Sequence, residues 1–158
     1  MKLKNERTLI LIKPDALQRN LLGKIIERFE QKGLRIIGLK MMQLDDVLLD
    51  EHYAHHKDKP FFEGLKRFMK NSPIVAMVLG GLEAVKIVRL ICGATCGREA
   101  DIGTIRGDFS MSTQANIVHA SDSPETAEKE IWRFFNSDEI FNYQKIDFNY
   151  IYSEEERK

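Results

Sequence analysis

The sequence predicts an α+β fold in which helices pack on a four-stranded sheet. Apolar runs of strand length occur at residues 8–12, 34–44, 74–79 and 117–119, and the segments between them repeat apolar residues at helical spacing. The 158 residues are enough to bury a core as one domain, which we expect to span residues 1–158. The longest apolar run is much too short to cross a bilayer, so we expect no membrane partner.

The composition limits the possible classes of function. Lysine and arginine together number 24, as do aspartate and glutamate, so no excess of positive charge favours nucleic acid as the main partner. Cys92 and Cys96 are too few for a disulfide scaffold, and no secretory leader precedes them. We therefore expect a cytoplasmic protein.

Residues 8–12 are typical of a central strand that is buried on both faces. The run ends at Lys13, and Pro14 after it cannot donate a hydrogen bond to a sheet. A lysine at a strand end can hold an anion in a cleft, although a surface lysine with a buried stem is the commoner case. No P-loop motif occurs in the sequence, so any nucleotide phosphates must be held by side chains.

The next segment predicts a helix and then a strand. Apolar residues recur at helical spacing over residues 21–29, with Asn20 as the expected N-cap and Gly33 as the residue that ends the helix. A strand over about residues 34–44 follows, interrupted at Gly38.

A helix that opens at Asp45 or Asp46 is expected to continue to His56. His52 and His56 would lie one turn apart on it and could share a zinc ion. No third ligand is evident nearby, and the His-Glu-x-x-His motif is absent, so the sequence gives little support to a metal site here. Tyr53, taken by itself, is typical of a packed or surface aromatic residue.

Residues 61–69 repeat apolar side chains at helical spacing, which predicts a helix with one face in the core. Phe61 and Leu65 lie on that stripe. The apolar run at residues 74–79 predicts a third strand, also buried on both faces, that ends in a turn at residues 80–81.

A helix over about residues 82–92 follows, and Arg89 lies outside its apolar stripe, free to reach an anion. Residues 93–115 show no periodicity, and a loop of this length in a compact domain is usually functional or disordered. Because the loop carries Thr95 and Arg106 among its polar residues, we expect it to be ordered and to face phosphate groups.

The fourth strand carries the histidine around which we expect the site to be organised. Residues 117–118 run into His119, and Ser123 and Pro124 then have the positions of an N-cap and a first helical residue. Glu130 lies seven residues after Ser123, on the same face of that helix. An arbitrary histidine is more often a core residue satisfied by its neighbours. A histidine at a strand end, between small residues and close to a helix start, favours a chemical role.

The residues around this histidine resemble the active-site signature of nucleoside diphosphate kinases. The likeness extends over nearly the whole chain, from residue 6 to about residue 152. Its motifs are Lys-Pro-Asp at 13–15, Glu-His-Tyr at 51–53, Pro-Phe-Phe at 60–62, Gly-Thr-Ile-Arg-Gly-Asp-Phe at 103–109 and Asn-Ile-Val-His-Ala-Ser-Asp at 116–122. Five motifs in the same order argue strongly against a chance resemblance.

The resemblance implies a ferredoxin-like α/β sandwich with a four-stranded antiparallel sheet. It also implies ping-pong transfer of the γ-phosphoryl group from a nucleoside triphosphate, typically ATP, to a nucleoside diphosphate through a phosphohistidine at His119. Nucleoside tri- and diphosphates would be the partners, and Mg²⁺ would be the cofactor, carried by the nucleotide with no dedicated metal ligands from the protein. A homo-oligomer is implied, and a hexamer is favoured over a tetramer or dimer.

The resemblance also assigns roles to single residues. Glu130, assisted by Ser121, would orient the ring of His119, and Tyr53 would lie beside it. The residues implied to contact the nucleotide are Lys13, Phe61, Leu65, Arg89, Thr95, Arg106 and Asn116. Of these, Phe61 and Leu65 would meet the base, Asn116 the sugar hydroxyls, and the others the phosphates.

The chain departs from the family pattern at three places. Cys96 and Gly97 stand where the family commonly has Asn-Pro, and Ile102 stands where it has a proline before Gly103. Thr113 replaces a small apolar residue, such as valine, near the base. These departures concern the rigidity of the long loop and the fit to the base, and they leave the phosphoryl-transfer residues intact.

Two hypotheses from other classes compete with a kinase. An inactive relative that serves as a binding module is disfavoured, because every transfer residue named above is present. A protein whose main role is to bind nucleic acid is disfavoured by the zero net charge and by the lack of a basic run. Labelling with γ-labelled ATP would separate these alternatives.

Overall fold

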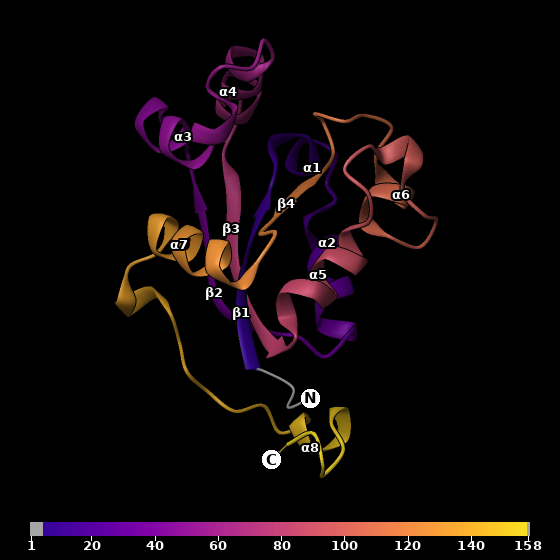
Figure 1. Ribbon diagram of the computed structural model, residues 1–158. Coiled ribbons are helices and arrows are strands. Elements are labelled where there is room, and N and C mark those ends of the chain that lie inside the picture. Colours follow the sequence, from indigo (N-terminus) through magenta and orange to yellow (C-terminus); the bar gives the residue numbers. More distant parts are fainter. Residues whose placement is uncertain (1–4, 158) are drawn as a thin grey trace.

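The computed structural model describes residues 5–157, and a four-stranded sheet runs through its centre (Figure 1). The strands are β1 (Asn5–Ile12), β2 (Arg35–Met42), β3 (Ile74–Leu82) and β4 (Val118–Ala120). Their order is β2-β3-β1-β4, and every neighbouring pair is antiparallel. This is the split β-α-β arrangement, so the predicted ferredoxin-like sandwich is confirmed.

Helices cover both faces of the sheet (Figure 1). One face carries α2 (Leu22–Gln31) and α5 (Ala84–Cys92), and the other carries α3 (Asp46–His52), α4 (Phe62–Lys70) and α7 (Pro124–Phe134). The shorter helical segments are α1 (Pro14–Gln18), η1 (Ala54–His56), η2 (Gly97–Glu99), α6 (Ile105–Phe109), η3 (Ser137–Glu139) and α8 (Phe148–Ile151). No helix within residues 5–157 is both long enough and apolar enough to span a membrane.

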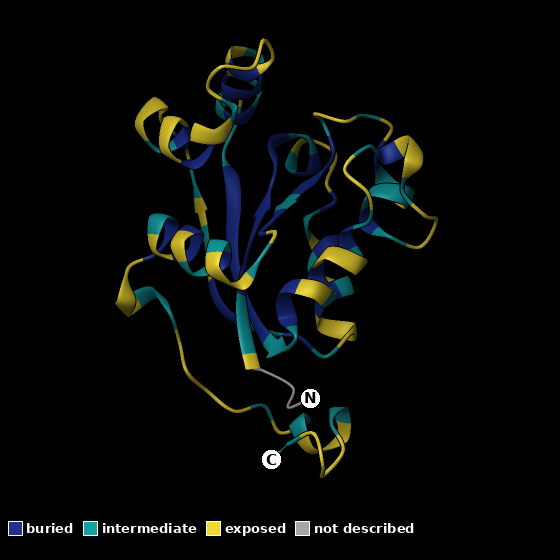
Figure 2. Cartoon of the chain, in the orientation of Figure 1, coloured by how far each residue is buried: buried dark blue, intermediate teal, exposed yellow. Residues whose placement is uncertain are grey.

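The central strand β1 explains why the sequence has an unbroken apolar run. Ile10 and Ile12 pack with α2 and α5 on one face, whereas Leu9 and Leu11 pack with α3, α4 and α7 on the other. Successive side chains of a strand point to opposite faces, so a strand between two helical layers must be apolar at every position. Figure 2 shows β1 and β3 buried over most of their length, whereas the edge strand β2 is partly exposed. The predicted burial on both faces is confirmed.

Two element boundaries differ from those expected at the sequence level. Asn20 does not cap α2: it has a left-handed φ of 56°, and the N-cap is Leu21, which makes no side-chain cap hydrogen bond. The helix that begins after Asp45 ends at His52, and Tyr53 is its C-cap. His56 therefore belongs to the separate segment η1.

The prediction of a turn at residues 80–81 is wrong. Gly80 and Gly81 are strand residues of β3, because β1 begins at Asn5 and pairs with β3 as far as Leu82. The chain turns at Glu83, two residues after the predicted turn, where φ is left-handed at 50°. Glycine is common in turns, but pairing with β1 keeps Gly80 and Gly81 in the extended conformation of a strand.

The interruption predicted near Gly38 is confirmed as a register shift between Ile36 and Gly38 in the pairing of β2 with β3. After α7 the chain forms the short helical segment η3. Beyond it the chain follows β2, since the Phe141 N–H donates to the Ile37 carbonyl at 2.8 Å. Figure 1 shows this last segment passing under the sheet to α8.

Candidate active site

The position of His119 follows from the alternation of side chains on a short strand. β4 has three residues, and His119 is the middle one, paired with Leu11 of β1. Val118 and Ala120 are buried in the core formed with α2 and α5. The imidazole therefore projects to the opposite face, the one that α7 covers.

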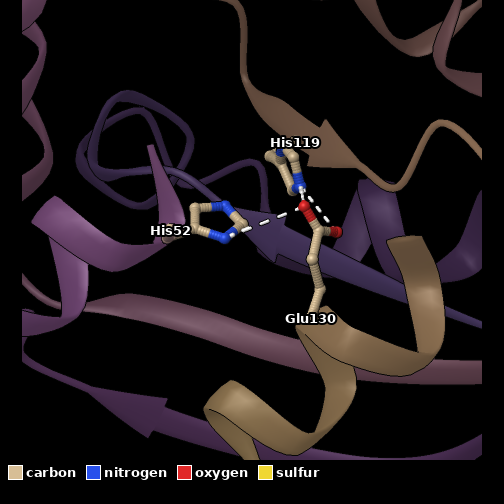
Figure 3. Close-up of side chains that lie close together, drawn as sticks. All are labelled: His52, His119 and Glu130. Atoms are coloured by element: carbon tan, nitrogen blue, oxygen red, sulfur yellow. Dashed lines mark hydrogen bonds and ion pairs between the residues drawn. The ribbon is translucent and has the colours of Figure 1, made fainter. Parts of the chain in front are cut away.

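The start of α7 directs a carboxylate toward this ring. Ser123 accepts a hydrogen bond from the Thr126 N–H at 3.1 Å, and Pro124 is the first helical residue, so the predicted N-cap and helix start are confirmed. Glu130 lies almost two helical turns after Pro124 on α7, and it is buried. Both of its carboxylate oxygens lie 3.1 Å from His119 Nε2 (Figure 3).

The carboxylate of Glu130 is held from a second side. Ser121 Oγ donates to Glu130 Oε2 at 2.6 Å and accepts from the Leu9 N–H at 3.3 Å. Burial acts to raise the pKa of Glu130, but the hydrogen bonds from His119 and Ser121 outweigh it, and the pKa lies below its ordinary value. An ionised carboxylate can only accept, so Nε2 of His119 carries a proton, and in the neutral ring the lone pair is on Nδ1.

A cavity of about 480 Å³ opens beside His119. Of the residues selected from the sequence, those that line it are Lys13, Tyr53, Phe61, Leu65, Arg89, Thr95, Arg106, Asn116 and His119. Ser121 and Glu130 do not line the cavity, because they lie buried behind the imidazole. The structure thus brings all eleven selected residues to one place, nine on the wall and two in support.

Three cations face this cavity. Lys13 Nζ donates to Asn116 Oδ1 at 2.6 Å, and burial, followed by repulsion from Arg106, lowers the pKa of Lys13 to about 8. The guanidinium of Arg106 donates to the carbonyl oxygens of Gly93 at 2.7 Å and Val118 at 2.8 Å. Arg89 lies on α5 at the same cavity and is exposed. Three positive charges in one partly enclosed space are suited to a polyanion.

The other end of the cavity is apolar. Phe61 precedes α4 and leaves 47% of its surface exposed, while Leu65 beside it is buried. His56 packs against Phe61 with ring centroids 5.2 Å apart and also lines the cavity, although the sequence suggested for it only a possible zinc site. Thr113 lines the same cavity. An exposed aromatic face at one end and cations at the other would suit a ligand with a planar ring and several phosphates.

Tyr53 lies beside His119, with ring centroids 6.3 Å apart. It is buried, and its hydroxyl has no hydrogen-bond partner among the described residues. Burial, and then the nearby charge of Glu130, raise the pKa of Tyr53, so the hydroxyl stays protonated and available to donate.

The arrangement of histidines differs from the one considered for zinc. His52 does not share a helix with His56; instead its ring packs against that of His119, with centroids 4.6 Å apart. Within residues 5–157, the candidate metal-binding group consists of His52, His119 and Glu130, whose donor atoms lie within 4.8 Å of one another. Mg²⁺ prefers six oxygen ligands, and two imidazoles with one already hydrogen-bonded carboxylate do not fit it.

Comparison with known proteins gives a consistent result. The family model described as nucleoside diphosphate kinase matches residues 6–140. The nucleoside diphosphate kinase of Methanobrevibacter smithii is 52% identical over 93% of this chain and 98% of its own length. Nucleoside diphosphate kinase A of Homo sapiens is 52% identical over 93% of this chain and 97% of its own. The solved structure of a halophilic nucleoside diphosphate kinase from Halobacterium salinarum in complex with CDP has a TM-score of 0.93 at 42% identity, covering 95% of this chain and 100% of that one.

Proposed function

This chain belongs to the nucleoside diphosphate kinase family, and we propose that it transfers the γ-phosphoryl group of a nucleoside triphosphate, typically ATP, to a nucleoside diphosphate through a phosphohistidine at His119. Enzymes of this family are phosphotransferases that act on nucleotides. The observation that carries the choice of His119 is its pairing with Glu130 through Nε2, which leaves Nδ1 as the nitrogen able to attack phosphorus.

In the first half-reaction, Nδ1 of neutral His119 attacks the γ-phosphorus. The new N–P bond forms as the bond from the γ-phosphorus to the bridging oxygen breaks, and the nucleoside diphosphate leaves with that oxygen. The ring becomes positively charged, and the ionised carboxylate of Glu130 stabilises that charge at the Nε2 proton. In the second half-reaction, a terminal oxygen of another diphosphate attacks phosphorus, the N–P bond breaks, and neutral His119 returns.

The cations of the cavity would supply most of the rate acceleration. Negative charge shifts toward the leaving oxygen and remains on the transferred group, so positive side chains fixed near these oxygens stabilise the transition state. We assign this role to Lys13, Arg89 and Arg106. Tyr53 can donate its free hydroxyl to the same group, and Thr95 would contact the phosphates.

The remaining contacts would hold the nucleoside. We propose that the base stacks on Phe61 and touches Leu65, and that the sugar hydroxyls meet Asn116. Every base can stack on an aromatic face, so this mode of binding would permit a broad range of nucleotides.

Enzymes of this family require a divalent metal ion. Because the described residues do not offer an oxygen-rich site, we propose that the ion is Mg²⁺ and that it enters as part of the nucleotide substrate. The protein's own contribution to charge neutralisation would then come from the cations named above.

We further propose a cytoplasmic homo-oligomer, with a hexamer as the favoured assembly. The two cysteines are unpaired, Cys92 in the core and Cys96 partly exposed, which suits a reducing compartment. The site draws on β1, α4, α5, the loop after α5, β4 and α7, so the activity should need the whole of the single domain that we assign to residues 1–158.

Incubation with γ-labelled ATP tests the proposal. The protein should acquire an acid-labile and alkali-stable label, which then moves to any nucleoside diphosphate that is added. The His119→Ala variant should take up no label, while circular dichroism and thermal unfolding show that it is folded. Label that persists in the variant would mean that another residue carries the phosphoryl group.

A further inference from the structure

His52 makes contacts that the proposed reaction does not yet use. It is the last residue of α3, and its side chain is buried, with 3% of the residue exposed. Its Nδ1 lies 3.8 Å from Glu130 Oε1 and 3.4 Å from Arg133 Nη1. An anion and a cation therefore approach the same ring nitrogen. Figure 3 shows His52 and His119 approaching the Glu130 carboxylate from two directions, with their rings side by side.

Arg133 is a natural competitor for Glu130. Both residues lie on α7, three positions apart, a spacing that puts opposite charges within reach of each other on a helix. An arginine can engage both oxygens of a carboxylate at once, and such pairs are strong where water is excluded. If Arg133 did this, neither oxygen would remain fully available to His119.

The structure shows Arg133 held elsewhere. Its Nε donates to Glu51 Oε1 at 2.8 Å, and among the described residues no ion pair joins it to Glu130. A guanidinium has no acceptor, so the contact with His52 requires the lone pair on Nδ1 and the proton on Nε2. The ring is neutral, since burial strongly lowers the pKa of His52, with further lowering from His119 and Arg133.

We propose that His52 is a positioning residue that keeps Arg133 away from Glu130. Its neutral ring gives Arg133 an acceptor and occupies the space through which the guanidinium would have to move. The carboxylate of Glu130 is then left to His119 and Ser121, and the imidazole keeps the tautomer in which Nδ1 is free. The inference rests on the proposed function, because Glu130 matters to the reaction only through His119.

A double-mutant experiment tests the idea. In His52→Ala, Arg133 is free to pair with Glu130, and we expect the rate of His119 phosphorylation to fall on the order of 10- to 100-fold. The KM for nucleotide should change little, because His52 does not line the cavity. In His52→Ala combined with Arg133→Gln, the competing charge is gone, and most of the rate should return. Arg133→Gln alone should stay close to the wild type, because the partner of Arg133 in its ion pair, Glu51, is exposed.

A purely structural role for His52 predicts a different result. Removing a second side chain from the same contact would then lower the rate or the stability further. The inference is therefore overturned if the double variant is phosphorylated no faster than His52→Ala. Two further variants cover the case in which His52→Ala does not fold. His52→Asn keeps a short acceptor near the position of Nδ1 and should retain most of the rate. His52→Leu keeps bulk but no acceptor, so it should be the slower of the two variants until Arg133→Gln is added. Equal rates for these two variants would also contradict the proposal.

The wild type separates this inference from the proposed function. If the wild-type protein takes no label from γ-labelled ATP, the proposed function itself is wrong. If the wild type is labelled but Arg133→Gln rescues no variant of His52, only the role given to His52 is wrong.

Discussion

His119 Nε2 lies 3.1 Å from each carboxylate oxygen of Glu130. This symmetric contact uses Nε2 as a donor and leaves Nδ1 free. Glu130 therefore favours the tautomer in which Nδ1 is the nucleophile. Ser121 limits the rotation of the carboxylate through its 2.6 Å hydrogen bond to Oε2. The order of the chain makes this possible, because β4 carries His119, Ser121 follows the strand directly, and α7 then brings Glu130 back to both.

The first prediction concerns Glu130→Gln. The amide keeps the shape of the side chain but loses the charge that stabilises the phosphorylated ring, so the rate of phosphorylation should fall on the order of 10- to 1000-fold. The affinity for nucleoside diphosphate should be unchanged, because Glu130 does not line the cavity. Rapid-quench labelling and equilibrium binding measure the two quantities. Glu128→Gln is the matched control, because this carboxylate also lies on α7 but is half-exposed and paired with Arg7. Equal rates for the two variants would remove Glu130 from the mechanism.

The second prediction is a pH dependence that originates from Lys13. Burial lowers its pKa to about 8 from a reference of 10.5, so the free enzyme carries this charge below pH 8 and loses it above. The value of kcat/KM should therefore fall as pH rises through about 8, since kcat/KM reports the ionisation of the free enzyme. Bound phosphates favour the charged amine, so kcat should fall only at higher pH. A pH series for the wild type and for Lys13→Arg, which stays charged, checks this. A decline of the same position and size in both would assign it to another group.

The parts of the fold that could be predicted from the sequence are those governed by local rules. The predictions of the core strands and of the start of α7 are confirmed, because the spacing of apolar residues and the capping of a helix depend on a few neighbouring residues. The turn at Gly80 was wrong because its conformation is decided by pairing with residues near Asn5, far away in the chain. The N-cap at Asn20 was wrong because this residue takes a left-handed turn that the pattern does not reveal.

The same reasoning applies to the site. Arg106 and Asn116 could be identified from motifs, but their hydrogen bonds could not, since Arg106 is fixed by the carbonyls of three separate residues. For His52 the sequence suggests only a possible metal ligand, because His56 follows at a spacing of one helical turn. Its actual partner, Arg133, lies 81 positions later in the chain, and no short-range signal reports such a contact.

The third prediction concerns the apolar end of the cavity. Phe61→Ala removes the exposed ring on which we expect the base to stack, and stacking contributes about 1–3 kcal/mol per base. The KM for nucleotide should rise by roughly 5- to 150-fold while kcat changes much less, because the lost contact is the same in the ground and transition states. Phe61→Trp keeps an aromatic face and is the control. Steady-state kinetics with ATP and with a pyrimidine nucleotide should give increases in KM for both. A loss confined to kcat would place Phe61 away from the base.

The final prediction concerns the loop at residues 93–115, in which this chain lacks two prolines that the family commonly has. At Ile102 the geometry suits proline. The Thr104 N–H donates to the Asp101 carbonyl at 3.1 Å, and Gly103 has a φ of 93°, which together indicate a type II turn with Ile102 at the position where proline is favoured. The Ile102 side chain is 94% exposed, so its loss removes little packing within the subunit.

Gly97 is the matched control, because proline does not fit there. Its N–H donates to the Ser112 carbonyl at 3.1 Å, and a Cβ at this position would collide with the carbonyl oxygen of Ser110. Ile102→Pro should therefore stabilise the loop by about 0.4–1 kcal/mol through the unfolded chain, whereas Gly97→Pro should destabilise it. If the loop packs between subunits of the proposed hexamer, Ile102→Pro should dissociate at a higher urea concentration than the wild type, and Gly97→Pro at a lower one. Equilibrium sedimentation of the three proteins across a urea series measures this order. A wild type that stays hexameric up to global unfolding, with no gain from Ile102→Pro, would show that other contacts hold the subunits together.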